Sequence, residues 1–200
     1  MATRAHSARV SGRGRPGAGV RAAALISVVF AYLLLVRSEL VPETVNGGWF
    51  IPPVLNIVVP LVLMPLVPGS SPTVARALLL ASYGFFGMGF LLYLLVLTML
   101  HHRLVLHPLP HAGLAPWRWI GLGPIGVGAL DLLKMARVAT AVFGSAGPAV
   151  SLMSKLAATV LWGFGVWWFA AAALLLVHYL RAGPLPFGIG WWGFTFPLGA

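Results

Sequence analysis

The stretch VARALLLASYGFFGMGFLLYLLVLTML, residues 74–100, contains one charged side chain, Arg76, in a run dominated by apolar and small residues. At ~1.5 Å of rise per residue, a helix of this length exceeds the ~30 Å hydrocarbon core of a bilayer. The run does not alternate between apolar and polar residues, as the strands of a membrane β-barrel do. We therefore expect a transmembrane helix that tilts or extends beyond the bilayer.

The whole chain has the composition of an integral membrane protein. Its 200 residues are 60% hydrophobic and 8% charged, with a mean hydropathy of +0.94, whereas about a quarter of the residues in a soluble domain are charged. Separate apolar stretches indicate an all-α, polytopic transmembrane helical bundle with about six spans. The expected spans are residues 22–36, 49–67, 74–100, 119–143 and 152–180, and a sixth that begins near Phe187.

The charge balance and the residue types exclude several classes of function. The chain has 13 lysines and arginines against 3 acidic residues, a net charge of +10, and no cysteine. The basic residues stand at span ends and in the N-terminal tail, so they do not indicate nucleic-acid binding. The sequence contains no nucleotide-binding loop, no paired catalytic carboxylates and no Ser/His/Asp grouping. We expect neither an enzyme nor a cofactor.

The N-terminal residues differ from the rest of the chain. Residues 1–21, MATRAHSARVSGRGRPGAGVR, carry five arginines and no apolar run, which predicts a disordered basic tail ahead of a membrane domain at 22–200. The tail followed by the apolar residues 22–36 also has the pattern of a signal peptide. Because no small-x-small cleavage site follows, a first membrane span is the favoured interpretation.

The second, fourth and sixth spans are rich in glycine and proline, while the third and fifth are long and bulky. The second span contains Pro52, Pro53, Pro60 and Pro65, and several glycines surround Pro124 in the fourth. Small residues let helices approach closely, and proline-broken helices in a bundle often line a cavity. The alternation therefore predicts an inner ring of pore helices, with Pro60 and Pro124 as pore-lining candidates. The alternative is that Gly and Pro are simply frequent in membrane helices.

Three charged residues lie within the fourth span. Asp131, Lys134 and Arg137 are spaced by three and are expected to share one helical face. Ionisable groups at membrane depth generally face protein or water and indicate function, so all three are pore-lining candidates. Alternatively, they partly neutralise one another and Arg137 snorkels toward the interface.

Histidines cluster in the stretch HHRLVLHPLPHAGLAPWRW, residues 101–119. A zinc site needs four ligands in fixed geometry, which a loop with several prolines does not indicate, so we expect no metal. Arg103 and Arg118 favour a solvated basic loop, which the positive-inside rule places in the cytoplasm. Arg37 and Arg181 would share that side. The arginines of the tail would fall on the opposite side, against the rule. The histidines are His101, His102, His107 and His111.

Four motifs resemble one family of membrane proteins. GGWFIPPVLNIVVPLVL, WRWIGLGPIGVGALDLL, VLWGFGVWWFAAA and PLPFGIGWWGFTFPLGA are similar to landmarks, in the same order, of the tellurite-resistance/dicarboxylate transporter family. This family includes TehA-like permeases, fungal malate and sulfite exporters and plant slow-anion channels. Its fold has ten helices in five hairpins, with the odd-numbered helices around a central pore.

On that plan the chain looks like helices four to nine. The membrane domain is then expected to be incomplete at both ends, and the second, fourth and sixth spans become pore helices. In the family a phenylalanine of the ninth helix plugs the pore, and the Phe-x-Phe spacing assigns that gate to Phe196. Phe194 would point away from the pore, about 200° around the helix. The alternative for Phe196 is a simple packing role.

The resemblance implies a multi-pass permease or channel for small anions in the plasma membrane. Candidate substrates are tellurite, sulfite, nitrate, chloride and four-carbon dicarboxylates. The expected partners are the anion, the lipid bilayer and, by family analogy, further copies of the chain in a homo-oligomer. Two alternatives are a non-transporting membrane scaffold subunit, which a partner completes, and an inactive truncated fragment.

Overall fold

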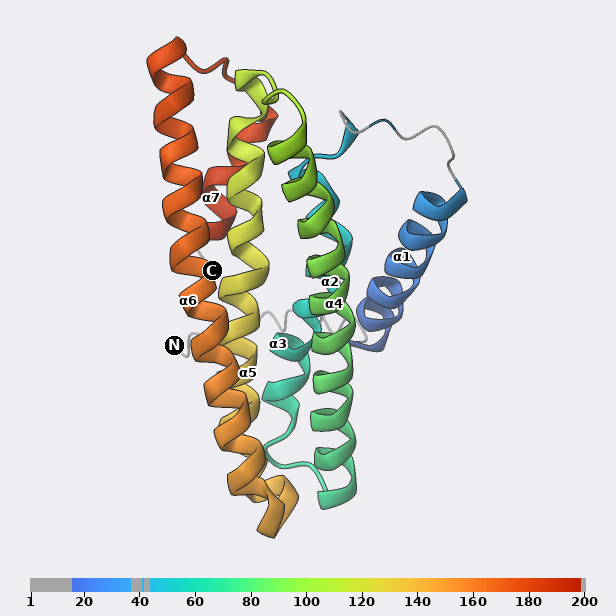
Figure 1. Ribbon diagram of the computed structural model, residues 1–200. Coiled ribbons are helices and arrows are strands. Elements are labelled where there is room, and N and C mark those ends of the chain that lie inside the picture. The colour runs from blue at the N-terminus through green and yellow to red at the C-terminus, as the bar shows by residue number, and fades with distance from the viewer. Residues whose placement is uncertain (1–15, 37–40, 42–43, 199–200) are drawn as a thin grey trace, which may run out of the picture.

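The computed structural model describes residues 16–36, 41 and 44–198. These residues are predominantly helical and include no strand, which confirms the all-α fold. Four helical segments are long and apolar enough to cross a membrane, and the last, Ala112–Ala182, consists of two helices joined at Gly144. Figure 1 shows the long helices running side by side, with the N-terminal helix tilted away from the others.

The helices follow the expected spans in order. The first span is α1 (Pro16–Val36), the third is α4 (Pro72–Leu106) and the fifth is α6 (Gly147–Ala182). The second span consists of η2 (Gly47–Phe50), α2 (Ile51–Ile57), α3 (Val59–Leu63) and η3 (Met64–Leu66). The fourth consists of η4 (Ala112–Gly121) and α5 (Leu122–Phe143), and η5 (Gly144–Ala146) joins it to α6. The beginning of the sixth span is η6 (Ile189–Trp191) with α7 (Trp192–Leu198).

Prolines divide the second span into short pieces. Pro52 and Pro53 lie in the first turn of α2, where a missing N–H costs nothing. The α-helix is interrupted at Val58, and Pro60 is the second residue of the next piece, α3. Because Pro60 has no N–H and its ring crowds the preceding turn, the helix cannot continue unbroken through this point. The second span therefore consists of consecutive short helices, whereas α4 and α6 are each one continuous helix.

Two boundaries differ from the sequence-based expectations. Helix α1 begins at Pro16, so residues 16–21 are helical, while the expected tail residues 1–15 lie outside the described residues. Helix α4 continues to Leu106, which places His101 and His102 in the helix and not in a loop. The apolar residues that follow these histidines extend the helical pattern, so the prediction of a loop starting at His101 is wrong.

The helices pack closely where glycines remove side chains from the interface. A Cβ atom on Gly89 of α4 would lie 2.8 Å from the backbone nitrogen of Ile57 and 2.8 Å from the carbonyl oxygen of Pro53. A Cβ atom on Gly165 of α6 would lie 2.9 Å from Ile125 of α5. Small residues at these crossings allow the backbones to approach, as is usual in membrane bundles. They hold the long helices against the second and fourth spans.

Candidate pore helices and their buried polar groups

The second span lies at the centre of the described bundle. Helix α2 contacts α1, α4 and α5. Half of the most apolar window of Gly47–Leu66 is buried (50%), against 28% or less in the other three candidate spans. The proline-rich segment is therefore the interior one, while α1 and α6 present large apolar side chains on their exposed faces. This arrangement agrees with an inner position for the second span.

The charged residues of α5 occupy three different environments. Asp131 is 0% exposed, Lys134 is half-buried and Arg137 is exposed. Three-residue steps on a helix rotate a side chain by about 300°, so each residue is displaced by about 60° from the one before it. The three side chains consequently move from the packed side of α5 to its open side. The sequence placed them on one face, and the structure separates them by burial.

Asp131 is the most unusual of the three residues. Neither carboxylate oxygen has a hydrogen-bond partner among the described residues, so Lys134 and Arg137 form no hydrogen bond with it. A charge in such surroundings is costly unless it is paired, protonated or reached by water. Pro60 and Pro124 are also fully buried. Asp131, Pro60 and Pro124 are thus covered by neighbouring parts of the chain. Their pore-lining role stays a prediction.

A buried polar contact between the first and second spans was not anticipated from the sequence. Asn56 is 0% exposed, and its side-chain amide donates to the hydroxyl oxygen of Ser27 and to the carbonyl oxygen of Pro52, the latter at 3.2 Å. The Ser27 hydroxyl lies 3.0 Å from the carbonyl oxygen of Ala23. The amide oxygen of Asn56 has no partner among the described residues. The sequence feature that could have predicted this contact is the lone amide, Asn56, within the apolar run IPPVLNIVVP.

The sixth span begins beside the fourth. Helix α7 contacts η4 and α5, and a Cβ atom on Gly193 would lie 2.5 Å from the carbonyl oxygen of Pro116. The ring of Phe194 packs edge-on against Trp119, with centroids 5.5 Å apart. The backbone of Phe196 belongs to α7, but its side chain lies outside the described residues. The predicted gate therefore stays a prediction, while Phe194 has a defined packing partner.

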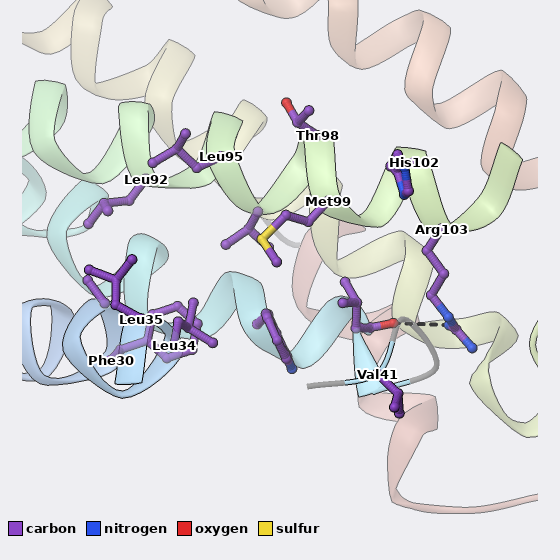
Figure 2. A pocket seen from close by; sticks show the side chains of 14 residues that line it. Phe30, Leu34, Leu35, Val41, Leu92, Leu95, Thr98, Met99, His102 and Arg103 are labelled. Carbon is purple, nitrogen blue, oxygen red and sulfur yellow. Dashed lines mark hydrogen bonds between the residues drawn. The ribbon is translucent and has the colours of Figure 1, made fainter. Parts of the chain in front are cut away.

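An open apolar groove of about 720 Å³ lies between α1 and α4. Figure 2 shows Phe30, Leu34 and Leu35 of α1 opposite Leu92 and Met99 of α4. Polar groups are few in its lining, so this groove has the character of a lipid-facing surface and not of an ion path.

The basic stretch at the end of α4 is less solvated than expected. Arg103 is 6% exposed and Arg118 is half-buried, so the prediction that both arginines belong to a solvated loop is wrong. Arg103 lies in α4 and donates to the carbonyl oxygen of Val45. Arg118 lies in η4, and its guanidinium stacks over the ring of Trp168. Within the described residues, no group of three or more His, Asp or Glu side chains is placed to hold a metal ion.

Comparison with known proteins finds that the chain is similar to membrane transport proteins. Residues 17–200 match the family model described as voltage-dependent anion channel. The chain is 34% identical over 179 residues to an uncharacterised transporter of Methanocaldococcus jannaschii, and 32% identical over 199 residues to a sulfite efflux pump of Arthroderma otae. In both cases the match covers 88% of this chain and 49% of the relative.

The chain thus spans about half the length of the curated relatives that it matches. No solved structure matches it. The family match covers the broken second span, the charged fourth span and the beginning of the sixth, in the order that the motifs predicted. The chain therefore belongs to the voltage-dependent anion channel family, the family of the TehA-like transporters and slow-anion channels.

Proposed function

We propose that this chain forms part of a plasma-membrane permease or channel for small anions. The observation that carries the proposal is the proline-broken second span, which is the most buried of the candidate spans and packs against α5. Broken helices leave backbone groups without helical partners, and such groups suit a path that ions traverse without binding tightly. Selection would then depend largely on the cost of removing water from the anion.

Sulfite is the first substrate to test. The Arthroderma otae relative is named as a sulfite efflux pump, and sulfite is a small oxyanion that a weakly binding pore admits. Chloride, nitrate, tellurite and four-carbon dicarboxylates are the other candidates. The basic residues near the pore helices favour anions over cations in every case, since a positive potential raises the local anion concentration.

Lys134 and Arg137 are the charged residues that we propose to meet the anion path. Both lie on α5, and neither is fully buried against the described helices. Asp131, one turn earlier, is enclosed. We further propose that Phe196 gates the pore, since α7 runs beside η4 and α5. A bulky apolar ring blocks ions because it leaves neither space nor hydration partners. Assembly with further copies of the chain belongs to the same proposal.

Reconstitution tests the proposal directly. The full-length protein in liposomes loaded with sulfite is expected to release it down its gradient, and parallel liposomes with chloride, nitrate, tellurite or malate rank the substrates. A folded, correctly inserted protein that moves none of these anions would instead favour the non-transporting scaffold.

A further inference from the structure

Three short 3₁₀ segments meet at one end of the bundle. Segment η4, which begins the fourth span, contacts both η2, at the beginning of the second span, and η6, at the beginning of the sixth. Helix α7 follows η6 and lies beside α5 (Figure 1). Trp117 belongs to η4 and is half-buried. It contacts both of the other segments, so one residue joins the beginnings of three proposed pore helices.

The indole of Trp117 reaches from the second span to the sixth. A Cβ atom on Gly48 of η2 would overlap Cζ3 of the six-membered ring and lie 3.2 Å from its Cε3. A Cβ atom on Gly190 of η6 would overlap Nε1 of the five-membered ring and lie 3.1 Å from its Cδ1. The two glycines therefore pack against different rings of the same indole.

Both contacts depend on the absence of a side chain. Neither Gly48 nor Gly190 has a positive φ, so alanine suits the backbone at both positions and lacks only the space. Gly47 makes a different contact, because its Cβ atom would lie 2.7 Å from the main-chain carbonyl carbon of Trp117. A side chain at Gly48 or Gly190 thus meets the indole, whereas one at Gly47 meets the backbone of η4.

The backbone that carries the indole is held by the long helices. The indole N–H of Trp168 on α6 donates to the carbonyl oxygen of Arg118, the residue after Trp117, at 3.1 Å. The hydroxyl of Tyr93 on α4 donates to the carbonyl oxygen of Gly121, which ends η4. Both donor side chains are buried. Segment η4 is therefore fixed to α4 and α6, and Trp117 projects from a fixed position.

The beginnings of the second and sixth spans are attached to η4 in different ways. In the second span, the Asn46 side chain accepts a hydrogen bond from the backbone N–H of Gly48 at 2.9 Å, which orders η2. The sixth span packs on η4 through Gly190 and through Gly193, whose Cβ atom would lie 2.5 Å from the carbonyl oxygen of Pro116. Close packing against η4, with Trp117 at its centre, thus sets where the sixth span begins.

We propose that Trp117 is a positioning residue of the pore, whose indole holds the beginning of the sixth span at a fixed distance from the beginning of the second. The inference rests on the proposed function, because α7 follows η6 directly and includes Phe196, the proposed gate. A bulky, rigid ring suits this role, since it packs against both neighbours without changing its own shape. Without the indole, the sixth span moves relative to the second, and the closed position of the gate is no longer fixed.

Spin labels measure the position of the sixth span without requiring transport. Ile51→Cys on α2 and Thr195→Cys on α7, both exposed within the described part of the chain, carry the labels in full-length protein freed of any other cysteine. We expect one narrow distance distribution with Trp117 present. Trp117→Ala should broaden or shift it, and Trp117→Phe should largely restore it, because a smaller ring still fills part of the gap. Trp162→Ala removes a 67% exposed tryptophan of α6 and should change nothing.

Glycine variants test the contacts one at a time. Gly48→Ala and Gly190→Ala should each lower Tm, and Trp117→Ala should reduce that loss by about half or more, because the group that clashes is gone. Gly47→Ala should lower Tm equally with and without the indole, since its Cβ meets the main chain. Gly188→Ala is the control, because its Cβ has nothing within 4 Å. If Trp117→Ala does not fold, Trp117→Leu replaces it throughout.

Single-channel recordings of the full-length protein measure the effect on the gate. Trp117→Ala should raise the open probability about fivefold or more at unchanged unit conductance, and Trp117→Phe should raise it less. A variant that is merely less stable gives fewer channels, but the open probability of each remains that of the wild type. The open probability therefore separates a positioning role from a purely structural one.

Three results would overturn the proposal. They are a spin-label distribution that stays narrow and unshifted in Trp117→Ala, equal Tm losses for Gly48→Ala and Gly190→Ala with and without the indole, and an unchanged open probability in a conducting Trp117→Ala protein. The proposed function fails separately. A folded wild-type protein that carries no anion current removes it, and the spin-label distances then still decide whether Trp117 positions the sixth span.

Discussion

The hydroxyl group of Tyr93 on α4 donates a hydrogen bond to the carbonyl oxygen of Gly121 at 3.1 Å, in a place where the tyrosine is 0% exposed. Gly121 is the last residue of η4, directly before α5. The contact therefore joins the third span to the point where the fourth span changes from a 3₁₀-helix to an α-helix. The contact gives the buried hydroxyl a hydrogen-bond partner, and it fixes the start of a proposed pore helix.

Tyr93→Phe should destabilise the protein by about 1 kcal/mol, because it removes a buried hydrogen bond while keeping the ring. Unfolding in a denaturing detergent titration measures the change. Tyr32→Phe is the control, since Tyr32 lies on α1 and is 61% exposed. Equal stability of the two variants would mean that the Tyr93 contact contributes nothing.

Gly89→Ala should destabilise the bundle by roughly 1–3 kcal/mol, because the added Cβ meets the backbone of the second span and only a shift of α4 relieves it. Gly84→Ala provides the matched control on the same helix, where a Cβ has nothing within 4 Å. There the gain in helix propensity should leave stability equal or higher. A Gly89→Ala protein as stable as Gly84→Ala contradicts the close crossing of α4 and α2.

Asp131→Asn should leave stability equal or higher, because it removes a buried carboxylate that has no hydrogen-bond partner among the described residues. Leu132→Asn introduces the same amide one position later, at a buried apolar site, and should cost about 1–3 kcal/mol. Both values come from the same denaturing titration. Marked destabilisation by Asp131→Asn would show that the carboxylate has a partner that the described residues do not supply.

Lys134→Ala and Arg137→Ala test the proposed anion path. If these residues face it, each variant should lower anion conductance in the full-length protein and change its salt dependence, because a local positive charge concentrates anions. Planar-bilayer recordings at two salt concentrations measure both effects. Unchanged conductance in both variants would leave only the snorkelling interpretation for these two residues.

Phe196→Ala in the full-length protein should produce a constitutive anion conductance if Phe196 is the gate. Phe194→Ala should not, because Phe194 packs against Trp119 and Trp191, and its loss should instead lower stability by about 0.5–1.5 kcal/mol beyond the area term. Currents are recorded for both variants in protein shown to be folded and inserted. Equally silent variants would return Phe196 to a packing role.

The sequence by itself determined the membrane class, the order of the spans and the break in the second span. These features depend on local chemistry: the apolar run at 74–100 needs no partner to favour a membrane helix, and Pro60 interrupts a helix wherever it stands. The motifs were sufficient to identify the family, since residues 17–200 match it.

Only the tertiary structure decided which polar side chains are buried. Arg103 resembles any basic residue at the end of a span, but its partner, the carbonyl oxygen of Val45, is 58 residues away along the chain. Asp131 and Arg137 lie on one helix, and the neighbouring helices, not their own spacing, make the first buried and the second exposed. Burial depends on which surfaces meet after folding, and local residue patterns carry no such information.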